Sequence, residues 1–193
     1  MSGEPTLMLS DVSVKRGGKL LISELSLTLS GPKLLWIVGG NGIGKTSLLL
    51  TCAGISRPES GQVGWAVDGV DVLAPEAVSF LPSNSYAKPA LTAAEDAKFW
   101  NANLKNVDLD RHNTTHTRSL STGQIKRLSF AKLLAAKKPI WILDEPLAGL
   151  DELGRGLIAG HLKTHVKNGG LALVASHAPM AVEGIPTQKL ALG

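Results

Sequence analysis

The spacing of apolar positions along the chain predicts strands first, and then strands that alternate with helices. Short, partly alternating apolar segments at residues 7–14, 20–22 and 25–29 predict strands, and Gly17-Gly18 and Gly31-Pro32 mark breaks between them. The first part of the chain is therefore expected to be rich in strands joined by turns.

The rest of the chain combines buried strands with helices. Continuous apolar runs at residues 34–38, 140–143 and 171–176 are typical of strands buried on both faces, as in a parallel sheet. Two more strands are predicted at residues 62–67 and 78–81. Helices are predicted at residues 45–53, 92–104, 123–138 and 152–168. This alternation predicts an α/β fold in which helices cover a parallel sheet.

One segment in the middle of the chain departs from this alternation. Its predicted helix begins with a capping box made by Thr92 and Glu95, and a polar stretch over residues 101–117 then predicts loop or short helix. We expect a small helical subdomain over roughly residues 82–122, inserted in a single domain that spans residues 1–193.

Composition and charge narrow the class of protein. The 193 residues carry a net charge of +4, and the Lys and Arg residues are scattered without a motif that reads nucleic acid, so we expect no nucleic-acid partner. The single cysteine, Cys52, lies in an apolar run and is expected to be buried. No signal peptide is evident, and no apolar run approaches the ~20 residues that span a bilayer. We expect a chain that does not cross a membrane by itself.

A glycine-rich loop carries the strongest chemical signal. Between the strand at 34–38 and the helix at 45–53, the sequence matches the phosphate-loop pattern G-x-x-x-x-G-K-[ST]. Its glycines let backbone N–H groups converge on phosphate oxygens, and the helix N-terminus adds positive potential. Lys45 can reach the terminal phosphates and the Thr46 hydroxyl can hold Mg²⁺. The predicted ATP-binding residues here are Gly39, Gly40, Asn41, Gly42, Ile43, Gly44, Lys45, Thr46 and Ser47.

Two acids end the apolar strand at residues 140–143. Asp144 is placed to bind Mg²⁺, directly or through water, and Glu145 is placed to act as the general base on an attacking water. Taken alone, two acids at the end of a strand are as readily explained by exposure to solvent as by a catalytic role. A phosphate loop in the same chain favours the catalytic reading, because a Mg²⁺-phosphate site requires such an acid.

With these motifs in place, the sequence resembles the ABC ATPases. Leu120-Ser121-Thr122-Gly123-Gln124 resembles their LSGGQ signature, with Thr122 in place of one glycine. The resemblance implies that Ser121, Thr122, Gly123 and Gln124 face the ATP bound to the opposite subunit of a head-to-tail homodimer. Residues 147–151 resemble the loop that crosses the dimer interface. The resemblance to the ABC ATPases also implies their fold: a P-loop core with a parallel sheet, an N-terminal antiparallel β subdomain and the small helical subdomain.

The resemblance extends to further site residues and also fails at two points. His177 stands where the family keeps a histidine that contacts the γ-phosphate and orients water. The family's aromatic platform for the base is missing, and either Arg16 stacks on the base instead or it is a solvated turn residue. The Mg²⁺-contacting glutamine is also missing, and Asn84 is the nearest equivalent, with an alignment uncertain by about one residue between Ser83 and Ser85.

Within the ABC ATPases, the sequence resembles most the ATP-binding subunit of the haem exporter of cytochrome c maturation. The shared strings include Lys88-Pro89-Ala90-Leu91-Thr92 and the stretch from Leu133 to Pro146. This implies hydrolysis of ATP with Mg²⁺, a transmembrane permease partner, and a peripheral position on the cytoplasmic face of the inner membrane. The alternatives are the ATPase of another small ABC exporter and a non-transport ATPase that acts on a soluble assembly scaffold.

Two histidine pairs have the i,i+4 spacing that can bind a metal on a helix. They are His112/His116 and His161/His165, and neither has the glutamate of H-E-x-x-H. We therefore expect surface histidines at these positions.

Overall fold

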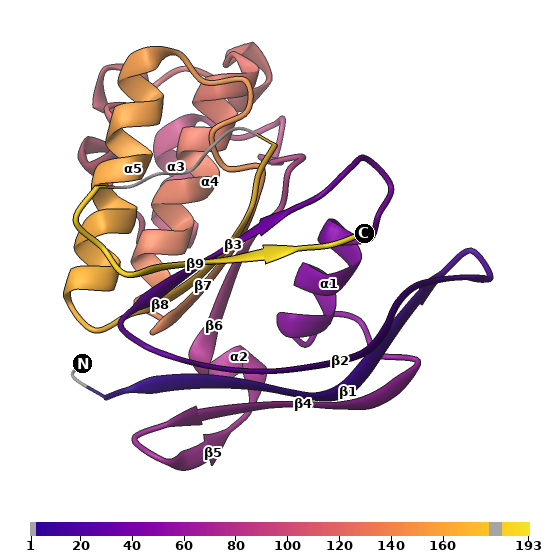
Figure 1. Cartoon of the computed structure of the whole chain (residues 1–193). Helices are drawn as coiled ribbons and strands as arrows, with labels where there is room; N and C mark the ends of the chain where they lie inside the picture. The colour runs from indigo at the N-terminus through magenta and orange to yellow at the C-terminus, as the bar shows by residue number, and fades with distance from the viewer. Residues whose placement is uncertain (1–2, 178–182) are drawn as a thin grey trace.

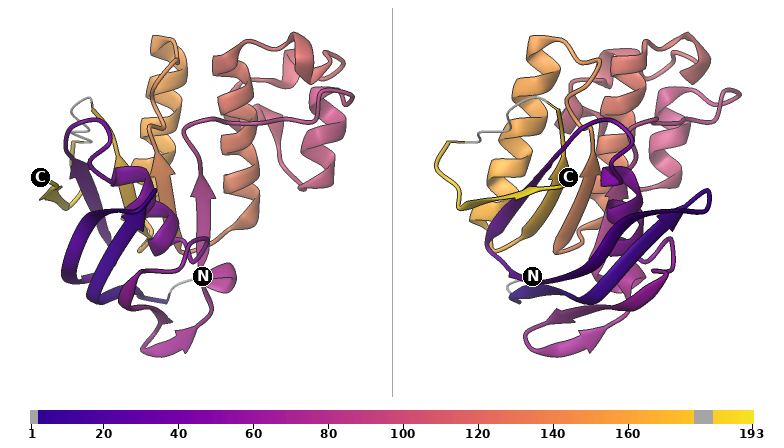
Figure 2. Two further views of the ribbon diagram at one scale, coloured as in Figure 1. Left: turned by 90° about the vertical axis from the view of Figure 1, so that its right-hand side faces the viewer. Right: turned by 45° about the vertical axis from the view of Figure 1, so that its right-hand side comes forward.

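Two sheets and a layer of helices make up the structure, a computed structural model that describes residues 3–177 and 183–193. Figure 1 shows a parallel sheet in the centre, with α3, α4 and α5 over one face. The helix α1 and a second, antiparallel sheet lie on the other side, and the turned views of Figure 2 separate the two sides clearly. The sequence prediction of an α/β fold with an N-terminal antiparallel sheet is confirmed.

The antiparallel sheet has the strand order β2-β1-β4-β5. Its inner face is apolar, and Leu7, Leu9 and Val12 of β1 are buried in the core beneath α1. The strands are β1 (Pro5–Arg16), β2 (Lys19–Ser30), β4 (Ser60–Val67) and β5 (Val70–Val72).

All neighbours in the second sheet are parallel, in the order β6-β7-β8-β3-β9. Parallel strands bring their carboxyl ends to one edge, and β7, β8 and β3 are adjacent, so the residues after these three strands meet there. The strands are β3 (Lys33–Val38), β6 (Val78–Leu81), β7 (Ile140–Asp144), β8 (Leu171–Ala175) and β9 (Thr187–Ala191).

The core divides into two parts, one on each face of the parallel sheet. In β7 the side chains alternate: Trp141 and Leu143 pack with the α4–α5 layer, whereas Ile140 and Ile142 pack toward α1 and the antiparallel sheet. The helices are α1 (Lys45–Cys52), α2 (Ala74–Ala77), α3 (Ala93–Phe99), α4 (Thr122–Ala136) and α5 (Glu152–Lys167). Three 3-10 turns follow α3, namely η1 (Leu104–Val107), η2 (Asp110–His112) and η3 (Thr117–Ser119).

Several predicted boundaries are wrong. The helix expected over residues 92–104 ends at Phe99, because Asn101 adopts a left-handed backbone with φ 53° that an α-helix cannot continue through. The two short strands expected at 20–22 and 25–29 form one strand, β2. The strands β5 and β9 and the helix α2 were not predicted, and β9 places a further core strand after residues 171–176.

Cys52 is buried, as predicted, and burial raises the pKa of its thiol to about 12. Across residues 3–177 and 183–193, no helix combines the length and apolar character that crossing a bilayer requires.

Candidate functional site

The glycine-rich loop lies between the carboxyl end of β3 and the first turn of α1. Gly44 precedes α1 with φ 117°, a conformation that strongly favours glycine. A Cβ on Gly39 would lie 2.8 Å from Leu192 O, so the chain passes too close to β9's end for a side chain. The Lys45 Nζ donates to Gly39 O at 2.8 Å and to Gly40 O at 2.9 Å, which holds the loop curled around this cation.

Asp144 meets the phosphate loop at the edge of the sheet. Its side chain is only 2% exposed, and Thr46 Oγ1 donates to Asp144 Oδ2 at 2.8 Å. The two oxygens predicted to bind Mg²⁺, from residues 98 positions apart, are therefore neighbours. A carboxylate beside a hydroxyl, with phosphates expected in front of them, is the hard oxygen donor set that Mg²⁺ prefers.

Glu145 and His177 lie together beside Asp144. The His177 backbone N–H donates to Glu145 Oε1 at 3.1 Å, and His177 Nε2 lies 3.5 Å from the same oxygen. The same ring nitrogen is 3.4 Å from Lys45 Nζ, so the imidazole stands between the carboxylate and the phosphate-loop cation. The Glu145 backbone is left-handed, with φ 47°, a strained conformation that points to a functional site.

These groups surround one hollow of about 380 Å³. The residues that line it come from the phosphate loop and α1, from the ends of β7 and β8, from the segment after β6, and from the β1–β2 hairpin. They are Arg16, Lys19, Leu21, Asn41, Gly42, Gly44, Lys45, Thr46, Ser47, Ser83, Asp144, Glu145 and His177. The hollow is large enough for part of a nucleotide, and Arg16 stands on its wall, as stacking on the base would require.

Asn84 does not lie with the predicted metal ligands. Ser83 lines the hollow instead, and Asn84 lies on a separate surface depression together with Tyr86 and Trp100. The chain bends at Ser83 and Asn84 directly after β6, and these two neighbours contribute to different depressions. The alternative alignment on Ser83 therefore fits the structure better than the one on Asn84.

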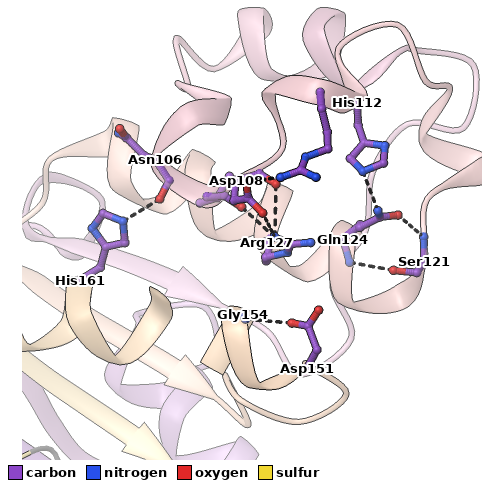
Figure 3. Close-up of polar contacts among 11 residues, drawn as sticks. Asn106, Asp108, His112, Ser121, Gln124, Arg127, Asp151, Gly154 and His161 are labelled. Carbon is purple, nitrogen blue, oxygen red and sulfur yellow. Dashed lines mark hydrogen bonds and ion pairs between the residues drawn. The ribbon is translucent and has the colours of Figure 1, made fainter. Parts of the chain in front are cut away.

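The signature lies at the N-terminus of α4 and away from this hollow. The Ser121 hydroxyl accepts from Gln124 N at 3.2 Å, and Gln124 Oε1 accepts from Ser121 N at 2.8 Å, which forms a capping box (Figure 3). Within the described lining of the hollow, no residue comes from Ser121–Gln124. Ser121 and Thr122 are exposed, so this helix N-terminus is available to an anion from another molecule.

Several residues around these motifs were not predicted from the sequence. His112 Nε2 lies 2.9 Å from Gln124 Nε2, and because Gln124 Oε1 already accepts from Ser121, the Gln124 amide donates to the imidazole (Figure 3). Lys19 and Leu21 line the hollow from the hairpin after Arg16. No motif marks these positions; only the register of β1 against β2 brings the hairpin here.

The expectation of surface histidines is wrong for His165. Its ring stacks on Trp141, with 3.8 Å between ring centroids and 8° between planes. Burial lowers the pKa of His165 to about 4. His161 Nε2 bonds to Asn106 O at 2.7 Å, so this pair serves packing and polar contacts on α5 (Figure 3).

Comparison with known proteins defines the class first. The family model described as ABC transporter matches residues 22–148, which include the phosphate loop, the signature and both acids. Solved structures agree on the fold. An "ATP binding subunit of ABC transporter" superposes with a TM-score of 0.83 at 17% identity, covering 96% of this chain and 85% of that one. A dimeric ATP-binding cassette bound to ADP and Pi gives 0.80 at 20% identity, covering 96% and 94%.

Full-length sequence relatives are more specific. The chain is 37% identical to the "Cytochrome c biogenesis ATP-binding export protein CcmA" of Bradyrhizobium diazoefficiens over 92% of this chain and 93% of that protein. The proteins of the same name from Agrobacterium fabrum and Rhodopseudomonas palustris are 37% and 33% identical, each over 92% of this chain and over 91% and 93% of their own lengths. The chain therefore belongs to the ABC transporter family and, within it, to the CcmA-type ATP-binding proteins, which makes it an ATP-hydrolysing enzyme.

Proposed function

We propose that this chain is the ATP-hydrolysing subunit of the haem exporter complex of cytochrome c maturation. The observation that carries this proposal is the identity of 33–37% to three CcmA proteins over 92% of the chain. The assembled ATP site supports it, because every group that the reaction needs from one subunit lies around one hollow.

The phosphate loop binds the triphosphate of ATP. The backbone N–H groups of the loop and the N-terminus of α1 face the phosphate oxygens. Lys45 moves from Gly39 O and Gly40 O to the terminal phosphates, because a phosphate is a stronger partner for an ammonium than a carbonyl is. Arg16 and Lys19 stand on the wall of the hollow that is left for the base and ribose.

Mg²⁺ accompanies the nucleotide, and Thr46 and Asp144 are the residues that would hold it. Two observations indicate that these residues suit Mg²⁺. Thr46 Oγ1 and Asp144 Oδ2 are 2.8 Å apart, and Asp144 is buried, where a carboxylate is stable only when a cation or hydrogen bonds compensate its charge. When bound, the ion neutralises charge that develops on the phosphate oxygens. Ser83, which lines the hollow, is one of the positions at which the family's glutamine is expected, and its place in the hollow supports it over Asn84 as a further ligand.

Glu145 accepts the proton of the attacking water as general base. His177 holds this carboxylate through its backbone N–H, and its ring lies between the carboxylate and Lys45. The imidazole is thus positioned to contact the γ-phosphate and to orient the water against Glu145.

A second copy of the chain completes each site. Ser121 and Thr122 lie at an exposed helix N-terminus and do not line the hollow of their own subunit. In a two-fold head-to-tail dimer, this N-terminus meets the γ-phosphate of the other subunit's ATP. Closure around two ATP molecules, and reopening after hydrolysis, is the movement that the complex uses.

A transmembrane permease receives that movement. The depression formed by Pro82, Asn84, Tyr86 and Trp100 lies where the segment after β6 meets α4, and Tyr86 is 70% exposed there. An apolar helix of the permease fits this surface, with Tyr86 as anchor. The chain would then be held at the inner face of the membrane by its partner.

Co-purification tests the assignment. The tagged chain and a Tyr86→Asp variant are recovered from detergent-solubilised membranes, and the retained proteins are identified. The proposal predicts that permease proteins of cytochrome c maturation come with the wild type and are depleted in the variant, whereas ATPase activity is kept. Recovery of another exporter's permease, or of a soluble assembly scaffold, would refute the haem exporter assignment.

A further inference from the structure

A buried lysine joins the signature helix to the turn that carries Glu145. Lys126 lies in the second turn of α4 and is 4% exposed. Its Nζ donates to Glu145 O at 2.8 Å and to Ala148 O at 2.9 Å. A buried ammonium is costly unless it is hydrogen-bonded, so these two carbonyls are what make its burial tolerable. Burial lowers the pKa of Lys126 although the charges of Glu145 and Asp144 raise it.

The two carbonyls are the two ends of one tight turn. The Ala148 N–H donates to Glu145 O at 3.2 Å and closes the turn, and Lys126 then bonds to both ends at once. Glu145 holds its left-handed backbone at the start of this turn. Such a conformation persists only when the surroundings fix it, and Lys126 is placed to do so.

The same helix begins at the signature, and its first turn also packs on this region. An added Cβ on Gly123 would lie 3.0 Å from Gly149 O, so the helix start and the segment after the turn are in close contact. Ser121 and Gln124 form the capping box of that helix start, one turn before Lys126 (Figure 3). The signature and the Glu145 turn are therefore held together at two points.

We propose that Lys126 is a positioning residue that sets the orientation of Glu145 and makes it depend on the position of the signature helix. The inference rests on the proposed split site, in which Ser121 contacts the partner subunit's ATP. Movement of α4 toward that ATP then moves Glu145 in the subunit's own site through Lys126. Each subunit thereby couples the nucleotide that its signature contacts to the nucleotide that its own glutamate hydrolyses.

Three variants of the full chain test this role. Lys126→Met keeps the length of the side chain and removes its donors, whereas Lys126→Gln keeps N–H donors on a shorter side chain. Lys138→Met is the control, because Lys138 Nζ also donates to a backbone carbonyl, Glu76 O at 3.0 Å, away from the site. The readouts are kcat and KM for ATP, and amide hydrogen exchange of the peptide over residues 145–150.

The expected order of kcat is wild type, then Lys126→Gln, then Lys126→Met. Misplacement of Glu145 should lower kcat of Lys126→Met by about 10- to 100-fold. The KM for ATP should change by no more than about twofold, since the phosphate loop is untouched. Exchange at Ala148 should be faster in both Lys126 variants and unchanged in Lys138→Met. If Lys126→Met does not fold, Lys126→Gln alone must show the lower kcat and the faster exchange.

Two results would overturn the inference. One is wild-type kcat and wild-type exchange in either Lys126 variant. The other is an equal loss of kcat in both variants together with an equal fall in melting temperature, which would mean that Lys126 only fills space. The exchange measurement needs no hydrolysis and no membrane partner, so failure of the haem exporter assignment leaves this test intact.

Discussion

Replacement of Glu145 by glutamine is expected to separate ATP binding from hydrolysis. The glutamine side chain has nearly the same size, and its amide oxygen can still accept the His177 N–H that now reaches Glu145 Oε1 at 3.1 Å. The Thr46–Asp144 contact and the Lys45 contacts do not involve this carboxylate. Folding stability and nucleotide affinity should therefore remain close to wild type.

The expected loss of activity follows from the loss of the base. A positioned general base contributes about 10²- to 10⁴-fold to a rate, and an amide cannot accept the water's proton. At about 1.36 kcal/mol for each factor of ten, this raises the barrier by about 3 to 5.5 kcal/mol. Since binding survives and hydrolysis does not, the ATP-bound dimer of Glu145→Gln should accumulate.

Single-turnover hydrolysis and gel filtration with ATP measure both effects. Lys45→Ala is the matched comparison, because loss of the cation should abolish hydrolysis and also weaken nucleotide binding. A kcat of Glu145→Gln within tenfold of wild type, or a monomer at saturating ATP, would refute the role given to this carboxylate.

Three further predictions concern other parts of the molecule. Ser121→Arg should leave ATP binding to the monomer intact and stop hydrolysis by blocking dimer closure; a loss of monomer affinity as large as in Lys45→Ala would contradict a split site. The site lacks an aromatic platform, whose stacking on a base is worth ~1–3 kcal/mol, and Arg16 lines the hollow instead. The dissociation constants for ATP and GTP should therefore agree within about tenfold in equilibrium titrations, and a larger preference for ATP would contradict this. Burial lowers the pKa of His165 from 6.5 to about 4, so the unfolded chain takes up the proton at a higher pH than the folded chain does. The free energy of unfolding at pH 7 should therefore decrease as the pH falls from 6.5 to about 4, by roughly 3 kcal/mol at most. Denaturant titrations of His165→Phe should lack that slope, and an unchanged slope would show that other groups cause it.

The sequence predicted best where a motif and its flanking elements demand the same geometry. The phosphate loop needed a buried strand before it and a helix after it, and the structure has β3 and α1 there. The prediction for Asp144 depended on the acid that a Mg²⁺-phosphate site requires, and the shared edge of the parallel sheet explains why the structure brings it to the loop.

The sequence predicted poorly where a single residue changes direction or where contacts are made across the fold. Asn84 and Ser83 are one residue apart, and only the path of the chain after β6 decides which one lines the hollow. The strand β9 has alternating exposed positions and is recruited by pairing with β3, which local periodicity does not reveal. The contact of His112 with Gln124 joins η2 to α4, and no spacing rule connects them.

Residues 82–122 connect the ATP hollow to the signature, and the proposed permease contact lies between them. This segment starts beside Ser83 in the ATP hollow and ends at Ser121 of the signature, and Tyr86 is exposed on it in between. It is also fixed to the helices: Arg127 of α4, 7% exposed, bonds to Val107 O and to Asp108, and His161 of α5 bonds to Asn106 O (Figure 3). Packed contacts of this kind transmit a displacement as a shift of whole elements and not as a local bend. We therefore expect that a permease bound at Tyr86 senses both ends of the reaction, the ATP held in the subunit's own hollow and the ATP contacted by its signature.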